Sequence, residues 1–397
     1  MPTSLIETIK NDAKAFKNEL IEIRHHIHSH PELSFQEFET AKFVENQLLA
    51  LGLKPNRIST TGVWAMINGS EGGKTVGLRA DLDALPINEV SNKPYISKNN
   101  GVMHACGHDV HTTSLLGAAK ILVKNKAHLK GNIKLIFQPG EEKLPGGASL
   151  LIKEGILTDP KVDVIIGQHV MPLINTGNVG FKKGLYMAST DEIYITVTGK
   201  GGHGAMPHLC VDPVVVAANI IIAMQQIVSR KAPPIIPSVL SFGKINSEGG
   251  ATNIIPNKVQ IEGTFRTVDE KWRAEAKVWI EKIAFNTAES YGAKVEVNIM
   301  NGYPFLKNDV PFTSSLEDNA KEYLGDNHVE ELDTWMAAED FSYYSQLVPA
   351  CFYRLGTRNE SKGIVNAVHT NSFDIDEDAI ENGAGLLAYL AIQAANS

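Results

Sequence analysis

The chain has 397 residues, of which 43% are hydrophobic and 21% are charged. This is the composition of a globular protein, and the length exceeds what one ordinary core accommodates, so two domains are expected. The formal net charge of -8 argues against a nucleic-acid-binding protein, because phosphate groups are bound by clustered Lys and Arg.

The cysteines and the N-terminal segment bear on location. Three cysteines, Cys106, Cys210 and Cys351, are too few for a disulfide framework, which suggests a reducing compartment. The N-terminal segment is charged and amphipathic and has no apolar signal core, and no apolar run reaches the length of a bilayer. We therefore expect a cytoplasmic protein with no membrane partner.

The first half of the chain alternates between helical and strand patterns. Amphipathic helices are predicted at residues 5 to 24 and 36 to 51. Short apolar runs typical of buried strands follow at residues 63 to 67, 75 to 80, 133 to 137 and 162 to 166. Helical stretches such as 112 to 124 separate several of them. Apolar strands alternating with helices favour an α/β sheet that is covered on both faces.

The pattern changes near Ala188. Alternating strands and longer helices follow in the order β-α-β-β-α-β, with predicted bounds of 192 to 198, 213 to 228, 238 to 245, 258 to 266, 271 to 290 and 294 to 299. This order is the split pattern of a ferredoxin-like domain, and its alternating strands imply one open face. After Tyr303 the chain returns to helix and apolar strand. We therefore predict a discontinuous domain at 1-187 and 300-397, interrupted by an inserted domain at 188-299.

Carboxylates or imidazole follow three of the predicted apolar strands. Asp81 and Asp83 come after the second strand, Glu141 and Glu142 after the third, and His169 ends the fourth. In α/β sheets, ligands gather at the carboxyl ends of the strands. Three strands that deliver such side chains to one edge predict a metal site there.

The segment HACGHDVH, residues 104–111, is the strongest metal signal in the chain. Thiolate and imidazole are good ligands of zinc and neighbouring divalent ions, and a turn at the intervening glycine can direct Cys106 and His108 at one centre. His111 is better explained as a structural side chain than as a ligand. Asp109 has the place to orient an imidazole by accepting its other N–H. The alternative is a helix N-terminus with incidental histidines.

Two neighbouring glutamates offer different chemistry. Adjacent side chains diverge, so Glu142 can bind metal while Glu141 faces the substrate as a general base. A surface Glu-Glu pair usually has no function, but this pair follows an apolar strand and a Pro-Gly turn. With His369 from a later loop, the candidate ligands number enough for two metal ions that share a bridging ligand. They are Cys106, His108, Glu142, His169 and His369.

Other histidines and polar residues give weaker signals. The cluster HHIHSH, residues 25–30, is explained by packing and carbonyl contacts at a helix end, and Pro31 follows. In the inserted domain, His203 lies in a glycine-rich turn, and Asn253 and Arg266 lie near strand ends. Arg suits bidentate capture of a carboxylate. From the residues alone these three are only candidates.

Ten elements, in order over nearly the whole length, carry a resemblance to a known family. They are RHHIHSHPELSFQE, RADLDALP, MHACGHDVH, FQPGEE, GQHV, GKGGHGAMPH, NIIP, GTFR, AAEDFSYY and VHTNSFD. The chain resembles the aminoacylase and carboxypeptidase-like metalloamidohydrolases, in the branch of hippurate hydrolases, N-acyl-amino-acid deacylases and auxin-conjugate hydrolases. The resemblance implies a mixed-sheet α/β/α zinc-peptidase-like catalytic domain with an inserted ferredoxin-like α+β domain for lid closure and dimerisation.

The resemblance also implies roles for single residues. Two divalent metal ions per chain, of zinc, manganese, cobalt or nickel, would be bridged by Cys106, where other branches use Asp. The remaining ligands would be His108, Glu142, His169 and His369, and Glu141 would be the general base. His203 would reach into the active site of the partner subunit and stabilise the oxyanion, which requires at least a homodimer. Asn253 and Arg266 would hold the substrate carboxylate.

One departure from the wider family is visible. Where other branches carry His-x-Asp-x-x-Pro, this chain has DLDALP at residues 81–86, so the His ligand of those branches is absent. The Cys106-containing branch is therefore the template, and Asp83 is expected to support ligands rather than bind metal. Asp109 has the same kind of supporting role.

The expected activity is metal-dependent hydrolysis of the amide bond of small N-acyl amino acids, which releases a carboxylate and a free amino acid. One alternative is a dipeptidase or carboxypeptidase that acts on small peptides, and another is a mononuclear zinc enzyme. A catalytically silent metal-binding scaffold is a third, although Glu141 and His203 argue against it because a scaffold needs no base.

Overall fold

The structure is a computed structural model, which describes residues 4–70 and 72–397. The chain forms two compact units. The first comprises Met1–Tyr186, Lys307–Thr334 and Asp340–Ser397, and the second Met187–Leu306 and Trp335–Glu339. The short segment Trp335–Glu339 joins the second unit because the backbone N–H of Ala188 donates to the carbonyl groups of Trp335 and Ala337.

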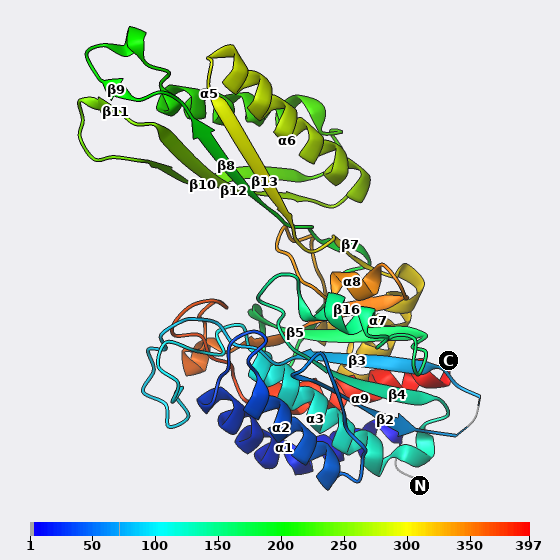
Figure 1. Ribbon diagram of the computed structural model, residues 1–397. Helices are drawn as coiled ribbons and strands as arrows, with labels where there is room; N and C mark the ends of the chain where they lie inside the picture. Colours follow the sequence, from blue (N-terminus) through cyan, green and yellow to red (C-terminus); the bar gives the residue numbers. More distant parts are fainter. Residues whose placement is uncertain (1–3, 71) are drawn as a thin grey trace. The chain divides into compact units, whose positions relative to one another are not determined.

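The first unit is built on an eight-stranded sheet with the order β1-β2-β4-β3-β5-β16-β6-β15 (Figure 1). The strands are β1 (Asn56–Ile58), β2 (Gly62–Asn68), β3 (Thr75–Asp81), β4 (Asn132–Gln138), β5 (Val164–Asn175), β6 (Val179–Phe181), β15 (Val329–Glu331) and β16 (Ala350–Arg358). Strands β4, β3, β5 and β16 are parallel, whereas β2 and β6 pair antiparallel with their neighbours β4 and β16. The predicted mixed α/β fold is therefore confirmed.

Three long helices of this unit pack together against the sheet. They are α1 (Leu5–Ser29), α3 (His108–Lys124) and α9 (Asp378–Asn396), and Figure 1 shows them stacked beside one another. A Cβ on Gly117 of α3 would lie 2.7 Å from the Cβ of Ala384, so small residues let α3 approach α9 closely. The other helices are α2 (Phe38–Ala50), α4 (Gly147–Lys153), α7 (Val310–Leu324) and α8 (Ser342–Ser345).

The second unit contains the predicted β-α-β-β-α-β pattern. Its elements are β8 (Asp191–Thr198), α5 (Pro213–Gln226), β10 (Ser238–Ser247), β12 (Lys258–Thr267), α6 (Glu270–Ser290) and β13 (Lys294–Asn301). The four strands pair antiparallel in the order β10-β12-β8-β13. Alternate residues of β8 are buried, because one face of the sheet packs on α5 and α6. Two short strands, β9 (Gly202–His203) and β11 (Ile254–Ile255), pair with each other.

Two further short strands are β7 (Gly184–Met187) and β14 (Leu306–Asn308). They stand where the chain passes between the two units.

One helical stretch of the second unit, Pro213–Lys231, is long and apolar enough to cross a membrane by length and composition. The expectation that no apolar run reaches this length is wrong by that measure, because α5 continues into a π-helical turn at Ile227–Lys231. Only 33% of the most apolar window is buried. Its buried residues, among them Val216, Ile220 and Met224, lie in the core of this unit, as those of a core helix do.

Candidate metal centre and active site

Neighbouring parallel strands of the first unit position the candidate side chains. Strand β3 ends at Asp81, and the turn after β4 carries Glu141 and Glu142. The prediction that His169 ends its strand is wrong, because β5 continues to Asn175. Its backbone stays paired with β16 beyond His169, so this imidazole projects from within the sheet.

All five predicted ligands gather in one place. Donor atoms of Cys106, His108 and His169 lie within 4.8 Å of one another, and so do those of Cys106, Glu142 and His369. Cys106 Sγ lies 3.4 Å from His169 Nε2 and 3.3 Å from His369 Nε2. His369 Nε2 is also 3.3 Å from Glu142 Oε1. Because Cys106 belongs to both groups, its thiol stands where a ligand shared by two ions would stand.

The chemistry of this donor set fits a pair of divalent cations. His108 Nε2 and Glu142 Oε1 are buried and have no hydrogen-bond partner among the residues that the structure describes. Such unpaired buried atoms cost free energy unless something binds them. Burial raises the pKa of the Cys106 thiol well above its usual range, and the carboxylates of Glu142 and Glu141 raise it further. A cation at this place would pair the orphaned atoms and stabilise the thiolate.

The two buried imidazoles are oriented by their other ring nitrogens. His169 Nδ1 donates to the carbonyl oxygen of Val170 at 2.8 Å, which leaves the Nε2 lone pair directed at Cys106. Burial, with the charges of His111 and Arg354, lowers the pKa of His169 well below its usual value, so the ring is the neutral ligand form.

His108 is held in the same way, by a carboxylate. Its Nδ1 donates to Asp83 Oδ1 at 3.2 Å, which leaves Nε2 for a metal. Burial lowers the pKa of His108, but Asp81, Asp83 and Glu142 outweigh it and raise the pKa to about 10. The carboxylates therefore attract positive charge to this place, and a metal ion would take the position of the proton.

His111 has both ring nitrogens engaged. Its Nδ1 donates to Asp81 Oδ1 at 2.5 Å, and its Nε2 accepts the backbone N–H of Val170 at 2.9 Å. With the Nε2 lone pair used in this way, the ring serves to join β3 to β5. This agrees with its interpretation as a structural side chain.

Asp83 contacts several parts of the centre at once. Its oxygens accept hydrogen bonds from His108 Nδ1, from Ser34 Oγ at 2.6 Å, and from the backbone N–H groups of Glu141 and Glu142 at 3.1 and 3.0 Å. The carboxylate therefore fixes one candidate ligand ring together with the turn that carries the two glutamates. That Asp83 supports ligands rather than binding metal stays a prediction.

Asp109 is fully buried but faces a different partner from the one expected. It accepts hydrogen bonds from Arg24 Nε at 2.9 Å and from His28 Nδ1 at 2.8 Å. The imidazole that it orients is thus that of His28, which is outside the candidate ligand set. The pair Arg24–Asp109 joins α1 to the first turn of α3, where His108 stands.

Glu141 borders the ligand cluster. Donor atoms of His108, Glu141 and Glu142 lie within 4.8 Å of one another, and Glu141 is 7% exposed. Its Oε1 accepts the backbone N–H of Asp340 at 3.4 Å. A carboxylate so placed can exchange a proton with a water molecule that is bound at the centre.

The comparisons with known proteins name the family. The sequence model described as Peptidase family M20/M25/M40 matches residues 77–393. The chain belongs to this family. It is 41% identical to Thermostable carboxypeptidase 2 of Saccharolobus solfataricus over 99% of both chains. It is 43% identical to the N-acyl-L-amino acid amidohydrolase of Geobacillus stearothermophilus over 75% of this chain and 80% of that one.

A solved structure of the family supports a two-metal centre. The YXEP protein of Bacillus subtilis, described as a dinuclear metal binding peptidase from the M20 family, superposes with a TM-score of 0.82 and 34% identity. The alignment covers 96% of this chain and 98% of that one. Taken with the donor cluster at Cys106, this makes the M20 chain a metal-dependent amidohydrolase.

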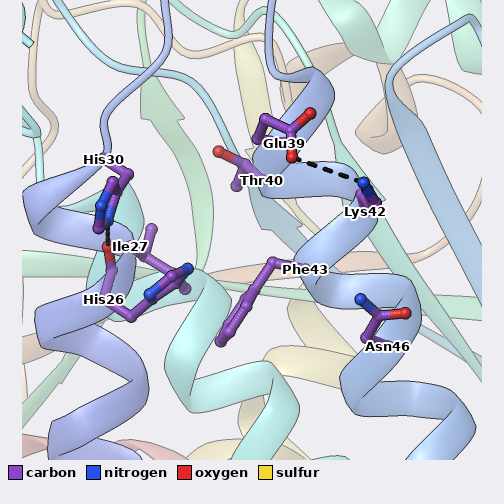
Figure 2. Close-up of a pocket in the computed structure, with 8 residues that line it drawn as sticks. All are labelled: His26, Ile27, His30, Glu39, Thr40, Lys42, Phe43 and Asn46. Carbon is purple, nitrogen blue, oxygen red and sulfur yellow. Dashed lines mark hydrogen bonds and ion pairs between the residues drawn. The ribbon is translucent and has the colours of Figure 1, made fainter.

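The histidine cluster at the C-terminal end of α1 lies outside this centre. His25 pairs with Glu377, and His30 Nδ1 donates to the carbonyl oxygen of His26 at 2.8 Å, as a helix-end role predicts. His26 and His30 line a pocket of about 280 Å³ between α1 and α2. Figure 2 shows these two residues with Phe43, whose ring stacks on that of His26. The pocket includes none of the five candidate ligands.

The candidates of the second unit lie on two different structures. His203 is exposed on β9, opposite Ile254 of β11, and the carbonyl oxygen of Asn253 accepts the N–H of Gly204. These two candidates therefore share one loop pair. Arg266 lies in β12, where burial lowers its pKa, and its Nη1 donates to the carbonyl oxygen of Met336 at 3.1 Å.

Sequence reasoning missed the side chain of Asp340 in the first unit. Its carboxylate accepts hydrogen bonds from Arg79 at 2.6 Å, from Gln138 at 2.9 and 2.8 Å, and from the backbone N–H of Ala148 at 2.9 Å. Its own N–H reaches Glu141. Asp340 belongs to AAEDFSYY, one of the elements of the family resemblance. Only the fold shows that its carboxylate binds Arg79, the first residue of RADLDALP.

Proposed function

We propose that this enzyme hydrolyses the amide bond of small N-acyl amino acids, of the N-acetyl or hippurate type. The observation that carries the proposal is the convergence of four candidate ligands on the fifth, Cys106, with Glu141 beside them. Relatives support the substrate class. They include the N-acyl-L-amino acid amidohydrolase named above and, at 41% identity over 92% of this chain and 85% of that one, the N-acetyl-L-cysteine deacetylase of Bacillus subtilis.

In this proposal Cys106, His108, Glu142, His169 and His369 would hold two divalent ions, with Cys106 in the position common to both donor groups. Two ions held in this way would supply an acidified water and polarise the substrate carbonyl. Zinc, manganese, cobalt and nickel all suit a mixed set of oxygen, nitrogen and sulfur donors, so the donor set alone leaves the choice among them open.

Glu141 is the proton carrier of the proposed reaction. Its carboxylate accepts a proton from the attacking water and returns it to the nitrogen of the leaving amine. The backbone N–H of Glu141 is bonded to Asp83, and one carboxylate oxygen accepts the N–H of Asp340. The first bond fixes the backbone of residue 141, and the second holds its carboxylate.

Residues of the second unit complete the proposed site. His203 stabilises the oxyanion in the active site of the partner subunit, and Asn253 and Arg266 bind the substrate carboxylate. The exposed position of His203 on a short two-stranded loop supports contact with another chain. The protein therefore acts at least as a homodimer, with the second unit as its dimerisation and lid domain.

All three cysteines are free in the described part of the chain, which supports a cytoplasmic location.

A carboxypeptidase activity is the second candidate. It is favoured by the two thermostable carboxypeptidases of Saccharolobus solfataricus, which are 41% and 40% identical to this chain. Both reactions use the same metal centre and the same base, and they differ in whether an acyl group or a peptide precedes the scissile bond.

Metal counting and a substrate panel test the proposal. The purified protein is assayed for amine release from N-acetyl, N-benzoyl and longer N-acyl amino acids and from unblocked dipeptides, with and without chelator. We expect about two metal ions per chain and chelator-sensitive cleavage of the N-acyl substrates. Cleavage of the dipeptides alone would favour the carboxypeptidase, and no cleavage despite bound metal would refute both.

A further inference from the structure

Two glutamates between α1 and α2 have different tasks. Glu37 stands at the N-cap of α2, yet its side chain makes no capping hydrogen bond to that helix among the described residues. Glu32 does so instead, because its carboxylate accepts the backbone N–H groups of Glu39 at 3.2 Å and Thr40 at 2.8 Å. The carboxylate of Glu37 is thereby available for contacts elsewhere.

Glu37 uses its carboxylate to hold the turn after β4. Its Oε1 accepts the backbone N–H of Gly140 at 2.8 Å and that of Phe35 at 2.8 Å, and its Oε2 accepts the hydroxyl of Thr61 at 2.7 Å. The side chain of Glu37 is 0% exposed. A buried acceptor with three donors fixes the groups that it binds more firmly than a solvated one, because no water competes for them.

Three consecutive amides of this turn are bonded to two buried carboxylates. Gly140 N donates to Glu37, and the N–H groups of Glu141 and Glu142 donate to Asp83. Glu37 and Asp83 thus determine the orientation of successive peptide planes. That orientation decides where the side chains of Glu141 and Glu142 point.

The turn is also tightly packed at Gly140. The residue has a φ of +60°, and a Cβ built on it would lie 2.2 Å from Cε1 of Phe35. Phe35 itself has a positive φ of 66°. Glycine adopts such an angle freely, but Phe35 does not, so the surrounding contacts must stabilise Phe35. The hydrogen bond from the Phe35 N–H to Glu37 is one such contact.

We propose that Glu37 is a positioning residue of the hydrolysis. It holds the Gly140 peptide so that Glu141 faces the reacting water while Glu142 faces the metal centre. The inference rests on the roles proposed above for these two glutamates. Its physical content, that Glu37 holds the amide of Gly140, can be tested without catalysis.

The first test compares two substitutions of Glu37. Glu37→Met removes the acceptor and leaves the Gly140 N–H unpaired, so the turn shifts. We expect kcat to fall about 10²-fold, with KM little changed, since a displacement near 1 Å has about this effect. Glu37→Gln keeps an oxygen for the two amides and directs its NH₂ at the Thr61 hydroxyl, which can accept, so it should retain most of kcat.

Two controls separate positioning from a general loss of stability. Glu32→Met removes the cap of α2 from the same segment, and it should lower the melting temperature without a comparable loss of kcat. In Glu37→Gln, the side-chain NH₂ donates to the Thr61 hydroxyl. Adding Thr61→Val removes that acceptor, so the double variant should lose the kcat that Glu37→Gln alone retains. Equal losses in Glu37→Gln and Glu37→Met, or an equal kcat loss in Glu32→Met, would overturn the inference.

Amide hydrogen exchange and cobalt titration make the test independent of turnover. In Glu37→Met, amide hydrogen exchange of the segment 139–143 should be faster than in the wild type. Of the two Co²⁺ ions expected per chain, the one with the lower affinity should bind less tightly in this variant. Glu32→Met should resemble the wild type in both measurements. Unchanged exchange and cobalt binding in Glu37→Met would overturn the inference even in an active enzyme. A wild-type chain that cleaves no substrate would refute the proposed function, and the exchange and cobalt data would still decide the role of Glu37.

Discussion

Replacing Glu141 by Gln should remove the proton carrier and leave its surroundings in place. The side chain is 7% exposed, and its Oε1 accepts the backbone N–H of Asp340 at 3.4 Å, a bond that an amide oxygen also accepts. The backbone N–H of residue 141, which donates to Asp83, is unaffected by the substitution. We therefore expect a folded variant with the metal content of the wild type.

The size of the effect follows from the loss of one proton transfer. General acid–base catalysis contributes about 10²- to 10⁴-fold, so kcat of Glu141→Gln should fall by at least about 10²-fold. At about 1.36 kcal/mol for each factor of ten, this corresponds to about 3–5 kcal/mol of transition-state stabilisation. Amine release gives kcat and KM, and atomic emission gives the number of metal ions per chain.

A matched substitution of the neighbouring residue shows which glutamate does what. Glu142→Gln removes a candidate ligand, so it should reduce metal content as well as turnover. If Glu141→Gln instead lost metal while Glu142→Gln kept it, the two roles would be exchanged. If Glu141→Gln kept both metal and full turnover, the reasoning about the base would be refuted.

Three further predictions concern other parts of the first unit. Arg24→Met removes the buried guanidinium that pairs with the carboxylate of Asp109, and it should lower the free energy of unfolding by about 3–5 kcal/mol, measured by chemical denaturation. Gly107→Ala adds a Cβ that lies 2.6 Å from Val170 at a φ of +81°, so metal content should fall. Hydrogen bonds from two lysines lower the pKa of Asp378 to about 2, so its stabilising contribution is lost as pH falls from about 4 towards 2. Asp378→Asn should therefore show a flatter acid-unfolding profile.

The strand-end residues could be predicted because their pattern is local. An apolar run followed by a Pro-Gly turn and two glutamates places Glu141 and Glu142 at the carboxyl end of β4 before any fold is known. Asp81 is located in the same way after β3. Because parallel strands present their carboxyl ends at one edge, these separate segments could be expected to converge.

Partners far apart in the sequence could not be predicted in this way. Asp109 was expected to orient an imidazole, but the sequence did not show that this imidazole is that of His28, nor that Arg24, 85 residues away, shares the carboxylate. The segment Trp335–Glu339 is bonded to the second unit through its backbone carbonyl groups, which leave no periodic pattern in the sequence. His169 was placed at a strand end because the predicted apolar run ends at Ile166, although backbone pairing with β16 continues past His169. Pairing depends on the neighbouring strand rather than on side-chain polarity.

Removing the metal should destabilise the first unit. Burial and nearby carboxylates raise the pKa of the Cys106 thiol, and His108 Nε2 and Glu142 Oε1 have no hydrogen-bond partner among the described residues. Bound cations offset these costs only in the folded state, so ions at about 100 times their Kd contribute about 2.7 kcal/mol each. Dialysis against chelator should therefore lower the melting temperature, and returning zinc or manganese should restore it. A melting temperature that is the same before and after chelation, in a chain shown to have lost its metal, would contradict the assignment of the cluster as a metal centre.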